Sequence, residues 1–92
     1  MSKKLALVTG GTRGIGAEIS IKLKDDGFDV VASYIGTPEA PNEFSKKTGI
    51  KVIKFDVSYY EDCVRAIKQI EEEAGNTIDI LVNNAGITKD KF

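Results

Sequence analysis

Short apolar runs alternate with amphipathic segments along this chain, and glycines separate the two. The run Leu5–Val8 is apolar throughout, which is typical of a strand buried on both faces of a parallel sheet. Behind it, Ile15, Ile19 and Leu23 recur every four residues and predict a helix that ends at Gly27. The first predicted strand therefore leads directly into a helix.

The next part of the chain repeats this pattern. Residues 30–32 predict a second strand, and residues 37–39 (Thr-Pro-Glu) predict the cap and first turn of a second helix. Pro41 leaves a later start open, and Gly49 is expected to end this helix. Residues 52–55 then predict a third strand, so two strand–helix units precede it.

A third helix and a fourth strand complete the pattern. Ser58 and Glu61 have the spacing of a capping box, which predicts that a helix begins at this point. Gly75 is expected to end this helix, and residues 78–82 predict the fourth strand. The buried side of the helix is expected to consist of Cys63, Ile67, Ile70 and Ala74.

This order of elements predicts an α/β fold in a single domain that covers residues 1–92. Strands that alternate with helices are joined by right-handed crossovers and form a parallel sheet. We expect a doubly wound sheet of four strands in the order 3-2-1-4, with three helices. Ligands bind such sheets beyond the carboxyl ends of the strands. The glycine-containing segments 9–16 and 83–86 both follow such ends.

Charge and composition exclude several classes of protein. The 92 residues include 13 Lys and Arg against 14 Asp and Glu, a net charge of −1, so nucleic-acid binding is not expected. No apolar stretch approaches the roughly 20 residues that span a membrane, and the first run is too short for a secretory signal. One cysteine and no histidine exclude an internal disulfide, Ser-His-Asp catalysis and the usual zinc sites. We therefore expect a cytoplasmic protein without a metal, nucleic-acid or membrane partner.

The segment 9–16 follows a predicted strand and opens a predicted helix, which is the setting of a dinucleotide-binding loop. Gly10 can make the tight turn, the backbone of Gly14 can approach a pyrophosphate, and Gly16 allows close packing of helix on strand. The first N–H groups of the helix then favour an anion. The alternative is a glycine-rich turn with a structural role only.

The residues after the second predicted strand indicate NADP rather than NAD. An NAD-binding fold usually places a carboxylate about 20 residues after the glycine motif. No acidic residue occurs from residue 30 to residue 38. Arg13 can instead offer a forked cation to a 2′-phosphate, and Ser33, Tyr34 and Thr37 can add hydroxyl donors. The alternative for Arg13 is a solvated surface charge.

Three motifs together resemble the short-chain dehydrogenase/reductase family: residues 9–16 (Thr-Gly-x-x-x-Gly-Ile-Gly), Asp56–Val57 and Asn83–Gly86. They span nearly the whole chain, and the resemblance implies the N-terminal half of a Rossmann fold. Within the family, segments between residues 26 and 39, and residues 85–90, resemble acetoacetyl-CoA reductases. Those enzymes reduce a 3-oxoacyl-CoA with NADPH on the way to polyhydroxyalkanoate. The near alternative is a 3-oxoacyl-acyl-carrier-protein reductase.

The resemblance also implies the residues that bind the cofactor. The glycine loop would contact the pyrophosphate and ribose, Asp56 would accept a hydrogen bond from the adenine, and Val57 would lie beside that ring. Asn83, Ala85 and Gly86 would border the nicotinamide-side ribose. Asp56 could instead be a charge at a helix N-terminus, and Asn83–Asn84 a simple turn. The predicted NADP-binding set is Gly10, Thr12, Arg13, Gly14, Ile15, Gly16, Tyr34, Asp56, Val57, Asn83, Ala85 and Gly86.

The catalytic Tyr-x-x-x-Lys of this family does not occur in these 92 residues. The three tyrosines, at positions 34, 59 and 60, are followed four residues later by Pro38, Cys63 and Val64. We therefore expect a cofactor-binding half whose catalytic C-terminal half is absent, and which alone is inactive toward a 3-oxoacyl-CoA. The alternative is a nucleotide-binding or interaction module without catalysis.

The fourth predicted strand has a further consequence for partners. In the order 3-2-1-4-5-6 this strand is an interior strand, but here no fifth strand follows to pair with it. Its apolar residues would lie at an open edge, where only Asp79 would place a charge. We therefore expect self-association through this strand, or pairing with the missing half.

Overall fold

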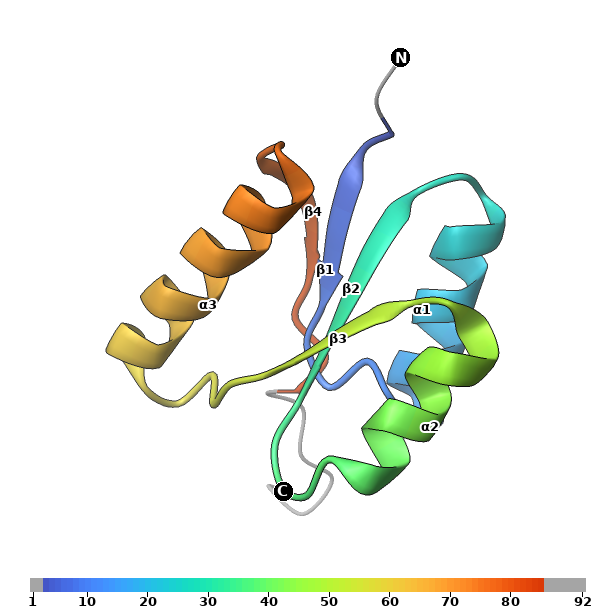
Figure 1. The fold of residues 1–92 in the computed structure, drawn as a ribbon, viewed down its shortest axis with the longest axis horizontal. Coiled ribbons are helices and arrows are strands. Elements are labelled where there is room, and N and C mark those ends of the chain that lie inside the picture. The colour runs from blue at the N-terminus through green and yellow to red at the C-terminus, as the bar shows by residue number, and fades with distance from the viewer. Residues whose placement is uncertain (1–2, 86–92) are drawn as a thin grey trace, which may run out of the picture.

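The computed structural model of the chain describes residues 3–85. The elements run in the order β1 (Leu5–Val8), α1 (Gly14–Asp25), β2 (Asp29–Tyr34), α2 (Glu39–Thr48), β3 (Lys51–Lys54), α3 (Tyr60–Ala74) and β4 (Ile78–Val82). The strands are parallel and lie in the order β3-β2-β1-β4. This confirms the predicted fold class. Helix α3 covers one face of the sheet, and α1 and α2 cover the other (Figure 1).

Strand β1 lies at the centre of the sheet and is buried on both faces. Its four residues are at most 1% exposed. It pairs with β2, with Leu5 opposite Asp29, and with β4, with Val8 opposite Val82. The core is therefore divided by the sheet into two clusters. The one under α3 includes Leu5, Leu7, Val31, Ile53, Phe55, Ala66 and Ile70, and the one under α1 and α2 includes Ala6, Val8, Val30, Ala32 and Ile50.

Glycines end the helices, as the sequence predicts. Gly49 after α2 has a φ of +78° and Gly75 after α3 a φ of +67°, a region that residues with a Cβ rarely adopt. Helix α1 ends at Asp25, two residues before Gly27, which has a φ of +99°. None of the helices within residues 3–85 is both long enough and apolar enough to cross a membrane.

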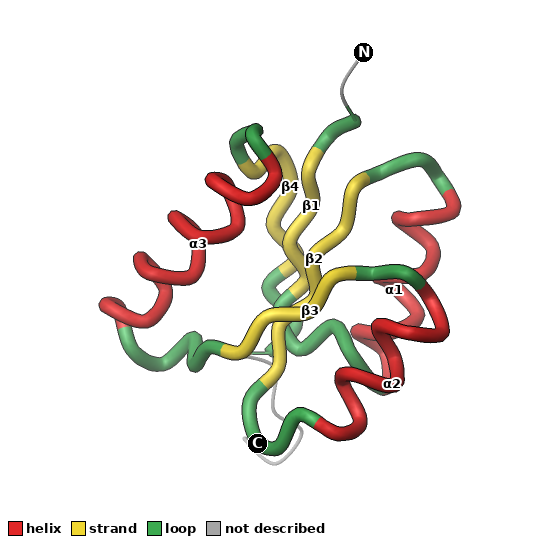
Figure 2. Tube along the Cα trace, in the orientation of Figure 1, coloured by secondary structure: helices red, strands yellow, loops and turns green. Residues whose placement is uncertain are grey.

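The predicted start of α2 is wrong by one residue. Pro38 is the N-cap of this helix, where Thr37 was the expected cap and Pro38 the first helical residue. Pro41 does not delay the start, because it lies in the first turn, where a backbone N–H has no partner within the helix. Pro41 is buried there. Helix α2 is one continuous helix (Figure 2). The two prolines therefore both belong to the beginning of this one helix rather than marking two alternative starts.

The predicted capping box at Ser58 and Glu61 is wrong. The N-cap of α3 is Tyr59, and no side chain of the described residues caps this helix end. The backbone N–H of Ser58 instead donates to the carboxylate of Asp56 (2.9 Å). That hydrogen bond closes a turn of the Asx type, which holds Ser58 in the loop before the helix.

Two positions of the predicted apolar stripes are exposed. Ile15, in the first turn of α1, is 72% exposed, whereas Ile19 and Leu23 pack on the core. In α3, Ile67 is 38% exposed, and Ala66, at 0%, takes its place on the buried side. Helical spacing thus identified the correct helices but not the exact direction of their buried faces.

Strand β4 contains a bulge next to its first residue. Leu5 lies opposite Ile78, but Ala6 lies opposite Ile80, so Asp79 has no counterpart on β1. The carboxylate of Asp79 accepts the backbone N–H of Leu5 at 2.8 Å. Our expectation that Asp79 places its charge on the free edge of the sheet is therefore wrong, because this carboxylate is bound to the paired strand.

The two edges of the sheet differ in character. The β3 edge carries two exposed lysines, Lys51 and Lys54, and edge lysines disfavour pairing with another chain. On β4, Leu81 is 60% exposed. Glu71 identifies the side of α3 nearest β4, because its carboxylate accepts the N–H of Ile78. The exposed residues Tyr60, Val64 and Ile67 share this helical side.

We expect the 92-residue chain to self-associate through β4. The free N–H and C=O groups of this strand can pair with a second copy, and Leu81 would then lose its exposure to water. The variant Leu81→Lys places a charge at the same edge and should shift the population toward the monomer of 10.0 kDa. Sedimentation velocity at micromolar concentration measures this shift.

The control for that experiment is Ile21→Lys, which makes the same exchange at a partly exposed position of α1 and should leave the oligomeric state unchanged. A monodisperse wild-type monomer, with slow amide exchange across residues 78–82, would contradict the prediction.

Candidate functional site

The glycine loop is tied to the end of β2. Gly10 makes the turn out of β1 with a φ of +63°, as expected. Its N–H donates to the hydroxyl oxygen of Ser33 (3.2 Å), and the N–H of Gly11 donates to the carbonyl oxygen of Ser33 (3.0 Å). Ser33 is 1% exposed. The expectation that Ser33 offers its hydroxyl to a phosphate is therefore wrong, because that hydroxyl is buried and supports the loop.

Two glycines of the loop have no room for a side chain. A Cβ on Gly16 would collide with the carbonyl oxygen of Gly10 and lie 2.8 Å from the side-chain nitrogen of Asn84, which confirms the close packing expected of Gly16. A Cβ on Gly11 would lie 2.7 Å from the hydroxyl oxygen of Ser20. That hydroxyl donates to the carbonyl oxygens of Gly11 (3.0 Å) and Gly16 (2.9 Å). Sequence reasoning missed Gly11 and Ser20, whose roles depend on contacts across the loop.

The beginning of α1 is open. Gly14 has a φ of +59°, and nothing lies within 4 Å of the position that its Cβ would occupy. The N-cap, Arg13, makes no side-chain capping bond with the described residues, and the first turn contains no acidic residue. The first N–H groups of a helix have no intrahelical partner and carry the positive end of its dipole. This arrangement fits an anionic group that approaches the backbone closely.

Thr9 joins the fourth-strand motif to the glycine loop. Its hydroxyl oxygen accepts the N–H groups of Asn84 and Ala85, both at 3.0 Å. The side-chain amide of Asn84 donates to the carbonyl oxygen of Gly10 at 3.2 Å. Asn83–Asn84 is therefore more than a simple turn, because Asn84 holds the two motifs together. Asn83 and Ala85 are exposed beside it, and Gly86 lies outside the described residues.

Asp56 and Val57 lie in the loop between β3 and α3. The N–H of Phe55 donates to the carbonyl oxygen of Tyr34 (3.2 Å), which brings this loop to the end of β2. Asp56 is half-buried and precedes the helix, and its carboxylate closes the turn at Ser58. Val57 packs in part against the core under α3. Asp56 thus lies three residues before the N-cap of α3, Tyr59, and outside the helix itself.

The first turns of α3 carry an ion pair that reaches this loop. Asp62 accepts the backbone N–H of Asp56 at 2.8 Å, and Arg65 donates to the other Asp62 oxygen at 2.7 and 3.0 Å. The hydrogen bond from the Asp56 backbone, followed by that from Arg65, lowers the pKa of Asp62 below its ordinary value. Arg65 also donates to the carbonyl oxygen of Lys54 (3.0 Å).

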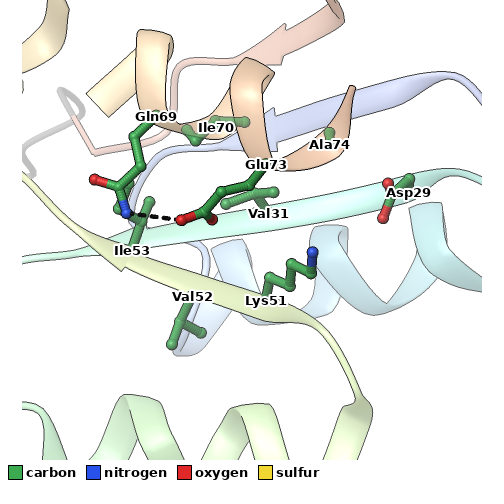
Figure 3. A pocket seen from close by; sticks show the side chains of 9 residues that line it. All are labelled: Asp29, Val31, Lys51, Val52, Ile53, Gln69, Ile70, Glu73 and Ala74. Atoms are coloured by element: carbon green, nitrogen blue, oxygen red, sulfur yellow. Dashed lines mark hydrogen bonds between the residues drawn. The ribbon is translucent and has the colours of Figure 1, made fainter. Parts of the chain in front are cut away.

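Two hollows lie near α3. A cavity of about 30 Å³, about the size of a water molecule or two, lies between the helix and strands β2 and β3, where Gln69 donates to Glu73 at 3.3 Å (Figure 3). It lies away from the predicted ligand-binding residues. An open hollow of about 350 Å³ adjoins the Asp56 loop. Its lining is Ile35, Lys54, Phe55, Asp56, Asp62 and Arg65.

The predicted residues thus gather at the carboxyl ends of the four strands. The glycine loop meets both the end of β2 and the fourth-strand motif, and the Asp56 loop meets the end of β2. Tyr34 and Thr12 are half-buried there, and Arg13 is exposed. The structure brings these positions to one edge of the sheet, which is where doubly wound folds bind their ligands.

Residues 4–92 match the family model of the short chain dehydrogenases. The chain belongs to this family. Among curated relatives, an acetoacetyl-CoA reductase of Shinella zoogloeoides is 59% identical over 87 residues, which are 95% of this chain and 36% of the relative. A 3-oxoacyl-acyl-carrier-protein reductase of Staphylococcus epidermidis is 40% identical and is matched over 97% of this chain and 38% of its own length.

Solved structures agree with this family membership. A short chain dehydrogenase of Bacillus anthracis superposes with a TM-score of 0.79 and 31% identity, over 88% of this chain and 35% of that one. The present chain therefore spans less than half of the length of the short chain dehydrogenases named here.

The Thr9 contacts generate a stability prediction. Thr9→Val keeps the shape of the side chain but removes the hydroxyl, so the N–H of Ala85 loses its acceptor. We expect the free energy of unfolding to fall by about 0.5–1.5 kcal/mol, measured by urea denaturation.

Thr9→Ser retains the hydroxyl and is expected to lose less than Thr9→Val. Equal stability of the Val variant and the wild type would show that these hydrogen bonds do not hold the two motifs together.

Proposed function

We propose that this chain is the NADPH-binding portion of an oxidoreductase. The observation that carries the proposal is the open first turn of α1, which has no capping side chain among the described residues and no acidic residue. Next to it, Gly14 leaves the backbone uncovered. A dinucleotide pyrophosphate matches both features, since it is anionic and binds backbone N–H groups.

The proposed preference for a 2′-phosphate rests on the positive charge of Arg13 and on the absence of acidic residues at the end of β2. Gly10 and Gly11 hold the glycine loop against Ser33, so Arg13 lies in the loop that adjoins Tyr34. Arg13 is exposed and forms no ion pair with the residues from 3 to 85. With no carboxylate between residues 30 and 38, this region favours a phosphate over a free ribose hydroxyl.

The substrate proposal rests on the relatives. We propose a 3-oxoacyl-CoA such as acetoacetyl-CoA, since the 59% identical relative carries the name acetoacetyl-CoA reductase. The second candidate is a 3-oxoacyl group on an acyl carrier protein, which the name of the 40% identical relative supports. The bound NADPH would supply the hydride that reduces the ketone.

Within that reaction, the residues of this chain bind and orient. The first turn of α1 holds the pyrophosphate, Arg13 pairs with the 2′-phosphate, and the loop at Asp56 and Val57 receives the adenine. Asn83 and Ala85 lie at the end of β4 and border the ribose on the reacting side. The proton donor of the family, a tyrosine with a lysine four residues later, is not part of these 92 residues.

The first test of this function concerns the 2′-phosphate. We expect the chain to bind 2′,5′-ADP more tightly than 5′-AMP, with NMR shifts at residues 10–16. Arg13→Glu should reverse this preference, because the new carboxylate repels the 2′-phosphate. Lys68→Glu on α3 makes the same charge change away from the loop and serves as the control. Equal affinity of the wild type for both nucleotides would rule out the assignment to NADP.

The second test concerns turnover. We expect no NADPH oxidation with acetoacetyl-CoA by the 92-residue chain alone, because a missing general acid costs about 10²–10⁴-fold in rate. A version extended through a Tyr-x-x-x-Lys segment should turn over, and comparing acetoacetyl-CoA with acetoacetyl-acyl-carrier-protein distinguishes the two substrates. Comparable turnover by the short and extended chains would contradict the proposal.

A further inference from the structure

The loop between β3 and α3 depends on side chains of α3 for its position. Residues 55–59 belong to no helix or strand, yet they carry Asp56 and Val57. Only its ends are fixed by backbone contacts: Phe55 donates to Tyr34, and Tyr59 donates to the carbonyl oxygen of Asp56 (3.2 Å). The N–H of Asp56 itself points away from the sheet ladder and needs another acceptor.

Asp62 provides that acceptor. Its Oδ2 atom accepts the Asp56 N–H at 2.8 Å, within the range of a charge-assisted hydrogen bond. The first turn of α3 contains two acidic residues, Glu61 and Asp62, and of these two only Asp62 forms a side-chain hydrogen bond with the loop among residues 3–85. A charge that merely complemented the helix dipole would not require this contact.

Arg65 fixes the direction of the Asp62 carboxylate. Its guanidinium donates to Oδ1 of Asp62 from two nitrogens and, through one of these, to the carbonyl oxygen of Lys54. Asp62 and Arg65 therefore bind the backbone on both sides of Phe55. On the same turn, the thiol of Cys63 lies 3.5 Å from the carbonyl oxygen of Val57 and can donate to it.

This backbone position determines where the Asp56 carboxylate points. Oδ1 of Asp56 accepts the Ser58 N–H, so the carboxylate turns together with the backbone of its own loop. Oδ2 of Asp56 forms no hydrogen bond with residues 3–85 and is the oxygen left to accept one from a ligand. A shift of the loop would move this oxygen.

We propose that Asp62, oriented by Arg65, is a positioning residue that holds the loop carrying Asp56 in place for an adenine-containing ligand. The part of this proposal that concerns the ligand rests on the proposed function. The part that concerns the loop rests on the hydrogen bonds of Asp62 and Arg65 alone. The two parts can be tested separately.

The experiment compares Asp62→Ala with Glu61→Ala, which removes an equal charge from the same helical turn without touching the loop. Two readouts are measured: the amide exchange of Asp56 without ligand, and the affinity for 2′,5′-ADP. In Asp62→Ala we expect the protection of the Asp56 amide to fall about tenfold and the affinity to fall about fivefold. In Glu61→Ala both should stay within about twofold of the wild type.

Asp62→Asn provides a rescue. Its side-chain oxygen can still accept the Asp56 N–H, so protection and affinity should each fall by less than about threefold. The Leu7 amide in the core of β1 reports whether a variant unfolds as a whole. If Asp62→Ala unfolds, Arg65→Met decides: it keeps the Asp62 carboxylate but removes the guanidinium that orients it, and Asp56 protection within about twofold of the wild type would overturn the proposal.

Unchanged protection of the Asp56 amide in Asp62→Ala overturns the proposal. Lost protection with unchanged affinity overturns the positioning role. If the wild type does not bind 2′,5′-ADP at all, the proposed function fails, and the exchange of the Asp56 amide alone then decides whether Asp62 holds the loop.

Discussion

The first turn of α1 packs directly against the carbonyl group of Gly10. The same carbonyl oxygen accepts a hydrogen bond from the side-chain amide of Asn84. Helix α1 can approach this closely only because Gly16 has no Cβ. The same approach places the N-terminus of α1 at the end of the buried strand β1. The open first turn of α1, the contact of its loop with β2 and the connection of that loop to the segment after β4 all depend on this one place in the backbone.

Much of the fold could be predicted from the sequence because its signals are local. A strand buried on both faces has to be apolar at every position, so the strand Leu5–Val8 and both of its ends could be predicted from the sequence. Gly49 and Gly75 were readable because a left-handed residue at a helix end excludes most other side chains. The helix starts were less predictable. Ser58 has the residue type and spacing of a cap, but its N–H is bound to Asp56.

In the candidate site, too, features that depend on a short segment could be predicted and those that depend on distant contacts could not. Gly10 and Gly16 could be predicted because the turn and the close packing lie within one short segment. Ser33 could not be assigned correctly, since the Gly10 N–H that it binds lies 23 residues away in the sequence. Asp62 could not be assigned either, because an acidic residue at the start of a helix has an ordinary explanation that does not involve the loop. From the sequence alone, a serine at the end of a strand is interpreted as a ligand-binding hydroxyl. The structure is needed to show that the glycine loop binds this serine. In the same way, an aspartate in the first helical turn reads as a dipole charge.

The pairing of β1 with β4 also has a consequence for how the chain folds. The hydrogen bond between Leu5 and Asp79 joins residues 74 positions apart, and that between Ala85 and Thr9 joins residues 76 apart. Strands β1, β2 and β3 are neighbours in sequence order and can assemble as soon as they leave the ribosome, since synthesis proceeds from the N-terminus. The edge of β1 that pairs with β4 stays unpaired until β4 has been synthesised, and contacts of such long separation form slowly. The contacts that join the glycine loop to the segment after β4 therefore form only after the first three strands have been synthesised.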